Sequence, residues 1–379
     1  MFKQFNEAGI HFYASRNNLS TKRGNVFYNP MMIVNRDFSV AIINALTTLN
    51  NKRMRILDLM AASGVRALRF SKSCVFEELV VNDVSKECVG VIKRNFKLNK
   101  IKNKRIKFCN ESANNLLLRS STFDYIQVDP FENIHKFLDL SLRKLKNNGI
   151  LALTTTDTAS LSGTYPKTCL RRYSSLPFKY DFKHEFGIRI LVKDLQRLTS
   201  KQDSFLEPLL CYHYKHHYGL FLRKVHSKRR ANESFKNHKY LIYCKKCLNA
   251  RITNSIFNSE KCPVCGSKLD FFGRFYTGSL WDRRVLSLML ENFKSKEAEF
   301  SRESFKLLSL IYEESSVETP YTINTHLIAK KYSLKPCSVN LLVESLKKDG
   351  FKASRTHFNN YSIRTNASVA DIVRIMKEC

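Results

Sequence analysis

The sequence predicts an α/β protein, with an open parallel sheet of the Rossmann-like type in its first part and a smaller α+β region in its last part. Three observations predict this. Short β-rich runs alternate with helical runs from about residue 53 to residue 154. A cysteine cluster follows near residue 250. The length of 379 residues also exceeds what a single core usually holds.

The elements of the sheet follow from the apolar pattern. Strands are expected at residues 54–60, 79–83, 105–108, 125–128 and 150–154. The helix expected at 86–98 places Val89, Ile92 and Phe96 on one face. A second helix is expected at 137–145, ending before Gly149. Further strands are expected at 188–192 and 219–222. Alternation of this kind predicts right-handed crossovers and a parallel sheet.

The polar, basic segment 226–239 is the candidate domain boundary. We therefore expect a first domain at 1–225 and a second at 226–379, with a zinc ribbon at 240–270. Between 322 and 367, two helical runs, a turn at Gly350 and two strand-like runs follow one another. That order is typical of a winged-helix-like module.

The charge points to a polyanionic partner. Lys and Arg number 64 against 33 Asp and Glu, a formal net charge of +31 that is spread along the chain. No apolar run approaches the roughly 20 residues that a membrane span needs, and the N-terminus lacks a signal-peptide core. We expect RNA binding, no membrane, no obligate protein partner, and an intracellular location in nucleus or cytoplasm.

Two strand ends predict a cofactor pocket. The first strand runs into Asp58 and a turn with one glycine, Gly64, and the second ends at Asp83. A dinucleotide fingerprint would have three glycines, so the turn better suits a nucleoside cofactor without a pyrophosphate. Asp83 could accept hydrogen bonds from the ribose hydroxyls. Taken singly, either aspartate could instead cap a helix; together they favour a class I, S-adenosylmethionine-dependent methyltransferase.

The fourth strand runs into Asp129, Pro130 and Phe131. An exocyclic amine of a base is a poor nucleophile because its lone pair is delocalised into the ring. A carboxylate and a backbone carbonyl that accept its hydrogens free that lone pair, proline fixes the turn, and an aromatic ring stacks on the base. These three residues are therefore the candidate catalytic group, although Asp-Pro also simply ends many strands.

Four cysteines have the spacing of a metal site: Cys244, Cys247, Cys262 and Cys265. Two such pairs suit a tetrahedral Zn²⁺ ion, which would be structural because so small a ribbon cannot bury a core of its own. Reduced, unliganded thiols are the weaker alternative. We expect no metal at the histidines that precede this cluster. They should face RNA or pack against other side chains: His213, His216 and His217.

Beyond these motifs, the chain resembles the tRNA (guanosine-26, N2)-dimethyltransferases over almost its whole length. The most specific matching blocks are Phe27-Tyr-Asn-Pro30 and Arg355-Thr-His-Phe358. Further matching blocks are Ser63-Gly-Val-Arg66, Asp129-Pro-Phe131, His184-Glu185 with Gly187 and Arg189, and Ile363-Arg-Thr-Asn-Ala367. The resemblance implies two successive methylations of guanosine N2, forming N2,N2-dimethylguanosine through N2-methylguanosine, with tRNA as partner.

The resemblance also implies roles for single residues. Cofactor binding is implied for Arg36 and Arg66 at the methionine carboxylate, for Asp83 at the ribose, and for Glu111, Ser112 and Ala113 at the adenine edge. It implies that Phe27 and Phe131 hold the target base beside Asp129. The family usually has Gly-Ser-Pro at Glu132-Asn133-Ile134 and Asp-Asp at Glu111-Ser112. An N2-monomethyltransferase and a catalytically weakened RNA-binding protein are the alternatives.

Overall fold

The structure is a computed structural model that describes residues 2–15, 26–131, 133–255 and 261–378. Contacts group these residues into two compact units. The first comprises residues 1–155, 219–226 and 283–309, and the second comprises 156–218, 227–282 and 310–379. One junction lies between residues 226 and 227, where the sequence predicts a boundary, but the chain passes between the units at other places as well.

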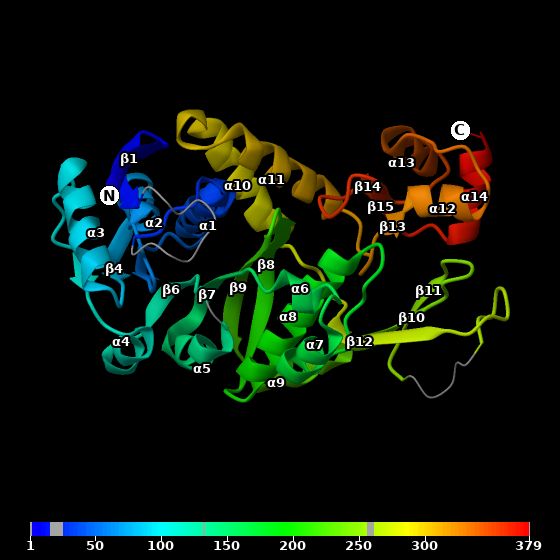
Figure 1. The fold of residues 1–379 in the computed structure, drawn as a ribbon, viewed down its shortest axis with the longest axis horizontal. Coiled ribbons are helices and arrows are strands. Elements are labelled where there is room, and N and C mark those ends of the chain that lie inside the picture. Colours follow the sequence, from blue (N-terminus) through cyan, green and yellow to red (C-terminus); the bar gives the residue numbers. More distant parts are fainter. Residues whose placement is uncertain (1, 16–25, 132, 256–260, 379) are drawn as a thin grey trace. The chain divides into compact units, whose positions relative to one another are not determined.

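A seven-stranded sheet has the strand order β5-β4-β3-β6-β7-β9-β8 (Figure 1). The strands are β3 Met54–Asp58, β4 Phe76–Asn82, β5 Ile106–Cys109, β6 Phe123–Val128, β7 Leu145–Thr155, β8 Ser204–Tyr214 and β9 His217–His226. The five from β5 to β7 pair in parallel. The Rossmann-like α/β prediction is therefore confirmed. The strand order reverses direction between β3 and β6, which is where open α/β sheets bind ligands.

The helices of the first unit begin and end close to their predicted bounds where the apolar pattern was clear. They are α1 Ile33–Asn50, α2 Val65–Ser73, α3 Lys86–Leu98, α4 Ala113–Arg119, α5 His135–Lys144 and α10 Arg283–Ser295. Helix α3 matches the predicted range, and Val89, Ile92 and Phe96 are all buried. Strand β7 follows α5 directly at Leu145 and runs through Gly149, so it starts earlier than the strand predicted at 150.

A buried ion-pair network joins the N-terminal hairpin of the first unit to its helices. The hairpin consists of β1 Phe2–Glu7 and β2 Ile10–Ser15. Glu7 accepts hydrogen bonds from Arg36 Nε on α1 at 2.7 Å, from Arg69 on α2 at 3.2 Å and from the Tyr28 hydroxyl at 3.0 Å. Each of these buried charges therefore has a partner, which burial requires.

The second unit contains α8 Lys183–Ser200, where the sequence predicted a strand at 188–192. That prediction is wrong. Every residue from Glu185 to Gln196 is buried, so this stretch has no solvent-exposed face, and its apolar run Ile188–Val192 resembles a buried strand. The same unit contains α6 Thr158–Leu161, α7 Pro166–Tyr173 and α9 Lys228–Ser234.

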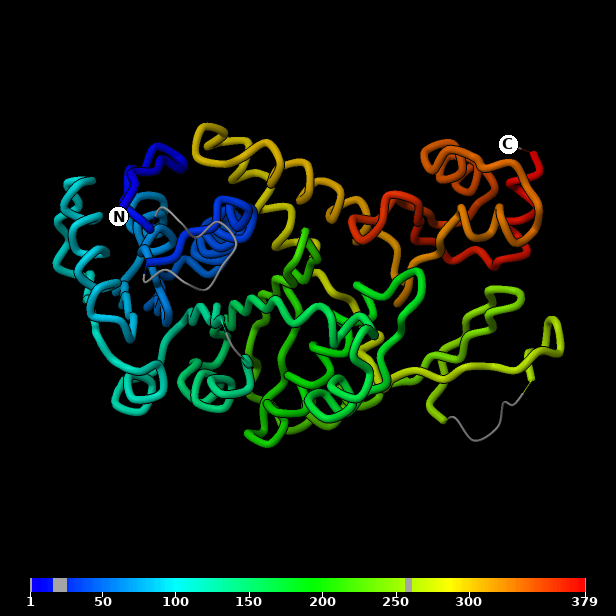
Figure 2. Tube along the Cα trace, in the orientation of Figure 1, coloured from blue at the N-terminus to red at the C-terminus, as the bar shows by residue number. Residues whose placement is uncertain are grey.

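Two small modules complete the second unit. The ribbon is a three-stranded sheet of β10 His238–Tyr243, β11 Ala250–Thr253 and β12 Asp270–Tyr276. The winged-helix-like module has helices α12 Thr325–Lys331, α13 Val339–Lys348 and α14 Val369–Glu378 around strands β13 Ile323–Asn324, β14 Ala353–Arg355 and β15 Ser362–Thr365. Figure 2 traces this module in orange and red. The predicted order of helices and strands is confirmed, with β13 and α14 added.

The family-specific blocks near the C-terminus form a second buried network. Glu314 ends α11 Arg302–Glu314 and accepts hydrogen bonds from the His357 amide at 3.1 Å and from Arg364 Nε at 3.0 Å. Burial alone would raise the pKa of Glu314. The charges of His357 and Arg364 outweigh burial and lower this pKa to about 2. Arg364 also pairs with Glu185 of α8 at 2.8 Å. These blocks therefore hold the second unit together.

No helix within the described ranges combines the length and the apolar character needed to cross a membrane.

Candidate active site

Three aspartates gather at the carboxyl ends of neighbouring strands. Asp58 ends β3, Asp83 follows β4 and Asp129 follows β6. In the sheet register, Asp58 lies opposite Val81 of β4 and Gln127 of β6. The predicted cofactor and catalytic residues therefore lie at one edge of the sheet, at the point where the strand order reverses.

The turn after β3 has a backbone that only glycine tolerates at one position. Gly64 has φ +76°, and a Cβ there would approach the Ile92 side chain to 2.9 Å. Asn95 of α3 fixes the turn from outside, because its Nδ2 donates to the Ser63 carbonyl at 2.9 Å. The glycine thus lets α2 start close against α3, beside the carboxylates.

Backbone amides hold Asp83 in place. Its two carboxylate oxygens accept hydrogen bonds from the Ala62 amide at 2.8 Å and the Ser85 amide at 2.9 Å. Each oxygen keeps a second lone pair. The carboxylate is therefore oriented by the turns after both strands and retains acceptor capacity for hydroxyls.

Asp58 is almost fully buried, and its Oδ2 has no hydrogen-bond partner among the described residues. The pKa of Asp58 is raised to about 7, mainly by burial. Arg66 offsets part of this rise, and the carboxylates of Asp129 and Asp83 add to it. Three carboxylates with one guanidinium leave an excess of negative charge. A cationic ligand with an N–H donor would relieve it, and S-adenosylmethionine carries both an ammonium and a sulfonium.

Replacing Asp58 with asparagine should stabilise the ligand-free protein at pH 8. The folded-state pKa of Asp58 is raised to about 7, above its unfolded value of about 3.9, so the wild type loses stability as pH rises between these values. The gain in Asp58→Asn should therefore be largest at pH 8 and shrink towards pH 4. Thermal melting at several pH values checks this, with exposed Asp139→Asn as the control. A difference that is independent of pH would contradict it.

Arg66 positions the candidate catalytic carboxylate. Its Nη2 pairs with Asp129 Oδ2 at 2.8 Å, and its Nη1 donates to Ser39 Oγ at 2.8 Å. Arg66 is buried, whereas about a third of the Asp129 side chain (32%) remains exposed. Asp129 is therefore held from behind by a buried guanidinium and keeps an open side towards solvent.

Two aromatic residues far apart in sequence meet next to this carboxylate. The rings of Phe27 and Phe131 lie edge to face, with centroids 4.8 Å apart and planes at 86°. Phe131 is 53% exposed, the largest exposed fraction of any phenylalanine among the described residues. Together with Pro130 they form an open aromatic corner of the kind that stacks on a base.

The other residues predicted to bind the cofactor have contacts with neighbouring protein residues. Arg36 pairs with Glu7 and donates to the Asn29 carbonyl at 3.1 Å, which supports the loop that carries Phe27. Glu111 pairs with Arg119 of α4. Ser112 caps α4 by accepting from the Asn115 amide at 3.3 Å, and Ala113 is its buried first residue.

Several supporting residues were missed from the sequence. Asn82 is one, because its side chain donates to the carbonyls of Leu59 and Glu111 and so ties the ends of β3 and β4 to the loop before α4. Ser39 and Asn95 are others. Ser39 lies next to apolar residues, and Asn95 lies among Lys93, Arg94 and Lys97, so neither stands out in the sequence. Asn133, one of the departures from the family pattern, accepts from the His135 amide at 3.1 Å at the start of α5. Its neighbour Glu132 lies outside the described residues.

The predicted cysteine cluster assembles in the ribbon. The ligand atoms of Cys244, Cys247, Cys262 and Cys265 all lie within 4.8 Å of one another. A tetrahedron of Zn–S bonds about 2.3 Å long has edges of about 3.8 Å, so the sulfur positions fit zinc. Both turns use the same backbone hydrogen bond, from Leu248 to Cys244 and from Gly266 to Cys262, each 2.8 Å long. Within the described ranges, no histidine joins a metal-binding group.

Comparisons with known proteins agree with this geometry. The model of the family described as N2,N2-dimethylguanosine tRNA methyltransferase matches residues 9–377. The tRNA (guanine(26)-N(2)/guanine(27)-N(2))-dimethyltransferase of Aquifex aeolicus is 37% identical over 93% of this chain and 90% of that protein. The tRNA (guanine(26)-N(2))-dimethyltransferase of Pyrococcus furiosus is 32% identical over 93% of each chain.

A solved structure is similar over the whole chain. Trm1 from Pyrococcus horikoshii, determined with S-adenosyl-L-methionine, matches with a TM-score of 0.85 and 28% identity, covering 99% of this chain and 100% of that one. The fold, the strand-end aspartates and the extent of the sequence match lead to one conclusion. This chain belongs to the N2,N2-dimethylguanosine tRNA methyltransferase family.

Proposed function

We propose that the protein transfers methyl groups from S-adenosylmethionine to N2 of guanosine 26 in tRNA, forming N2,N2-dimethylguanosine through N2-methylguanosine. The observation that carries the proposal is the end of β6, where a carboxylate held by Arg66 lies beside an exposed aromatic corner. The names and descriptions of the similar proteins support the substrate and the position.

The chemistry follows from the side chains. Phe131 and Phe27 hold the flipped guanine, and Asp129 and the Pro130 carbonyl accept hydrogen bonds from its exocyclic amine. These two acceptors return lone-pair density to the nitrogen, and Asp129 takes the proton that leaves when the new C–N bond forms. The cofactor supplies an electrophilic methyl group. Positioning and electrostatics are the contributions of the protein.

The cofactor lies at the ends of β3 and β4 in this proposal. Asp83, already fixed by two backbone amides, binds the ribose hydroxyls. Asp58 offers its unpartnered oxygen to the cationic end. Arg66 acts mainly on Asp129 in this account, and Arg36 acts through the loop that carries Phe27, because both side chains already have the partners described above.

The second unit binds tRNA in this proposal. A stacked base must be flipped out before it reaches Asp129, at a cost of a few kcal/mol, and basic residues that grip backbone phosphates offset this cost. Zn²⁺ at the four cysteines stabilises the ribbon. Removal of everything after residue 225 would also delete residues 283–309 of the first unit, so side-chain substitutions test the division of labour more cleanly than truncation.

A tRNA transcript with adenosine at position 26 should accept almost no methyl groups. The amine of adenine occupies a different edge of the base, so it does not reach Asp129 in the same pose. Incorporation of labelled methyl groups into the two transcripts checks this, with another tRNA guanosine changed as a control. Equal incorporation into both transcripts would show that position 26 is not the target.

A further inference from the structure

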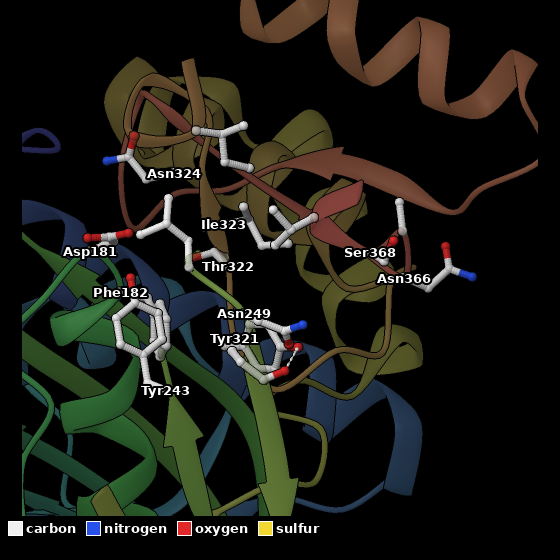
Figure 3. Close-up of a pocket in the computed structure, with 15 residues that line it drawn as sticks. Asp181, Phe182, Tyr243, Asn249, Tyr321, Thr322, Ile323, Asn324, Asn366 and Ser368 are labelled. Atoms are coloured by element: carbon white, nitrogen blue, oxygen red, sulfur yellow. Dashed lines mark hydrogen bonds between the residues drawn. The ribbon is translucent and has the colours of Figure 1, made fainter. Parts of the chain in front are cut away.

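A cavity of about 270 Å³ lies within the second unit, and none of its lining residues takes part in the proposed reaction (Figure 3). Its walls come from the residues before α8, from the ribbon and from the start of the winged-helix-like module. Its size is close to the lower end of the roughly 300–1,000 Å³ typical of ligand pockets. It therefore has room for one small group rather than for a long chain.

Aromatic rings form one wall of the cavity. Phe182 and Tyr321 stack with centroids 5.6 Å apart and planes at 30°. Tyr243 lies edge-on to Phe182, with centroids 6.5 Å apart. Figure 3 shows Phe182 and Tyr243 on the same side of the site. Phe182 and Tyr243 are buried, and Phe178 stacks on Phe182 with centroids 4.0 Å apart, so the ring that a planar ligand can contact is the partly exposed Tyr321.

One buried polar group in the lining has no hydrogen-bond partner in the described part of the chain. The Thr322 hydroxyl is buried, with the residue 1% exposed, and has no hydrogen-bond partner among the described residues. A buried, unsatisfied hydroxyl costs free energy, so it points to a ligand that the free protein does not contain.

Asp181 is a second polar residue of the lining, and its carboxylate forms a hydrogen bond with its own backbone. Its carboxylate is half-buried and forms no ion pair with a described residue. Burial raises its pKa to about 6, so it is still mostly charged at neutral pH. Two carboxylate oxygens without a cation are suited to a pair of adjacent N–H donors.

We propose that this cavity binds an unstacked guanine base of the tRNA, a base other than the one that is methylated. Guanine is flat, and its Watson–Crick edge presents two adjacent N–H donors that match the oxygens of Asp181. RNA-binding proteins commonly read single, unstacked bases by stacking and by contacts to that edge. A phosphate would be repelled by Asp181, whereas the net charge of +31 favours RNA as the source of the base.

This proposal rests on the proposed tRNA substrate, and two substitutions test it. Asp181→Asn and Thr322→Val keep the shapes of their side chains; the first replaces one of the two acceptor oxygens by a donor, and the second removes the hydroxyl. Each should weaken tRNA binding roughly tenfold, within the range for losing a contact that reads a base. Neither should lower the melting temperature of the free protein, because the Thr322 hydroxyl has no partner among the described residues and an amide oxygen can still accept the backbone hydrogen bond of Asp181.

Matched controls separate binding from folding. Asp203→Asn changes an exposed carboxylate of the same unit and should leave tRNA affinity unchanged. Thr325→Val removes a buried hydroxyl that does have a partner, the Tyr361 carbonyl at 3.0 Å, and should lower the melting temperature. Photo-cross-linking of tRNA that contains 6-thioguanosine should label the peptides of Phe182 or Tyr321, and Asp181→Asn should reduce this labelling.

The outcomes are distinct. Wild-type tRNA affinity in both variants, or lower melting temperatures in both, would overturn the guanine site. Labelling of the same peptides by free 6-thioguanosine, with no change in tRNA affinity in the variants, would assign the cavity to a free nucleoside and overturn the tRNA assignment. Absence of methyl transfer by the wild-type protein would instead refute the proposed function, because the binding and cross-linking comparisons do not depend on turnover.

Discussion

Asp129→Ala should lower the rate of methyl transfer by roughly 10²–10⁴-fold, the range for a positioned proton acceptor, while tRNA affinity stays within about twofold. Asp129 acts on the amine in the transition state, whereas tRNA affinity comes mainly from phosphate contacts. Single-turnover methyl transfer and filter binding with the same tRNA separate the two effects.

The control for this substitution is Asp139→Ala. Asp139 lies on α5 of the same unit, and its side chain is 66% exposed and pairs with Arg143. It should retain wild-type rate and affinity. If Asp129→Ala retained the wild-type rate, the amine would not depend on this carboxylate. If its tRNA affinity collapsed together with the rate, the residue would act in binding or folding instead.

Cys262→Ser should release the zinc ion and unfold the ribbon. Cys262 is buried, and its sulfur lies 3.5 Å from that of Cys247. Structural zinc sites contribute on the order of 10 kcal/mol in small zinc-binding peptides, so the loss should far exceed that of an ordinary core substitution. Metal analysis by mass spectrometry and thermal melting measure the two effects.

Cys337→Ala provides the comparison. Cys337 is buried in the core of the winged-helix-like module and takes no part in the four-cysteine cluster. This variant should keep one zinc per chain and melt close to the wild type. Freshly purified wild-type protein without zinc would contradict the assignment, as would a Cys262→Ser variant that keeps its full zinc content.

The sheet and its strand ends could be predicted because short-range patterns determine them. The apolar strands, the glycine turn at Gly64 and the positions of Asp58, Asp83 and Asp129 are all local in sequence. Parallel strands bring their carboxyl ends to one edge, so the sequence alone predicts that these aspartates lie close together. The spacing of the four cysteines is equally local.

The remaining features depend on contacts between distant residues. The apolar run of helix α8 resembles a strand in the sequence because the helix is buried on nearly all sides. The pairing of Glu7 with Arg36 and Arg69, and of Glu314 with Arg364, joins segments that no periodicity links. The passage of the chain back into the first unit at residues 283–309 likewise has no local signal.

The roles of the arginines show the same limit. The resemblance assigned Arg36 and Arg66 to the cofactor, and the structure pairs them with Glu7 and Asp129. Whether either one also contacts the cofactor stays a prediction. The sequence marks Arg36 and Arg66 as members of family-specific blocks, and the structure identifies the carboxylates with which they pair.

Mass spectrometry of nucleosides tests the central claim most directly. Unmodified tRNA is incubated with the protein and S-adenosylmethionine, and the tRNA is digested at successive times. N2-methylguanosine should rise first and then fall, while N2,N2-dimethylguanosine accumulates to about one per tRNA that has guanosine 26. A methyl group on another atom of guanine, or no methylated guanosine at all, would contradict the assignment of Asp129 and its aromatic corner as the site of N2 dimethylation.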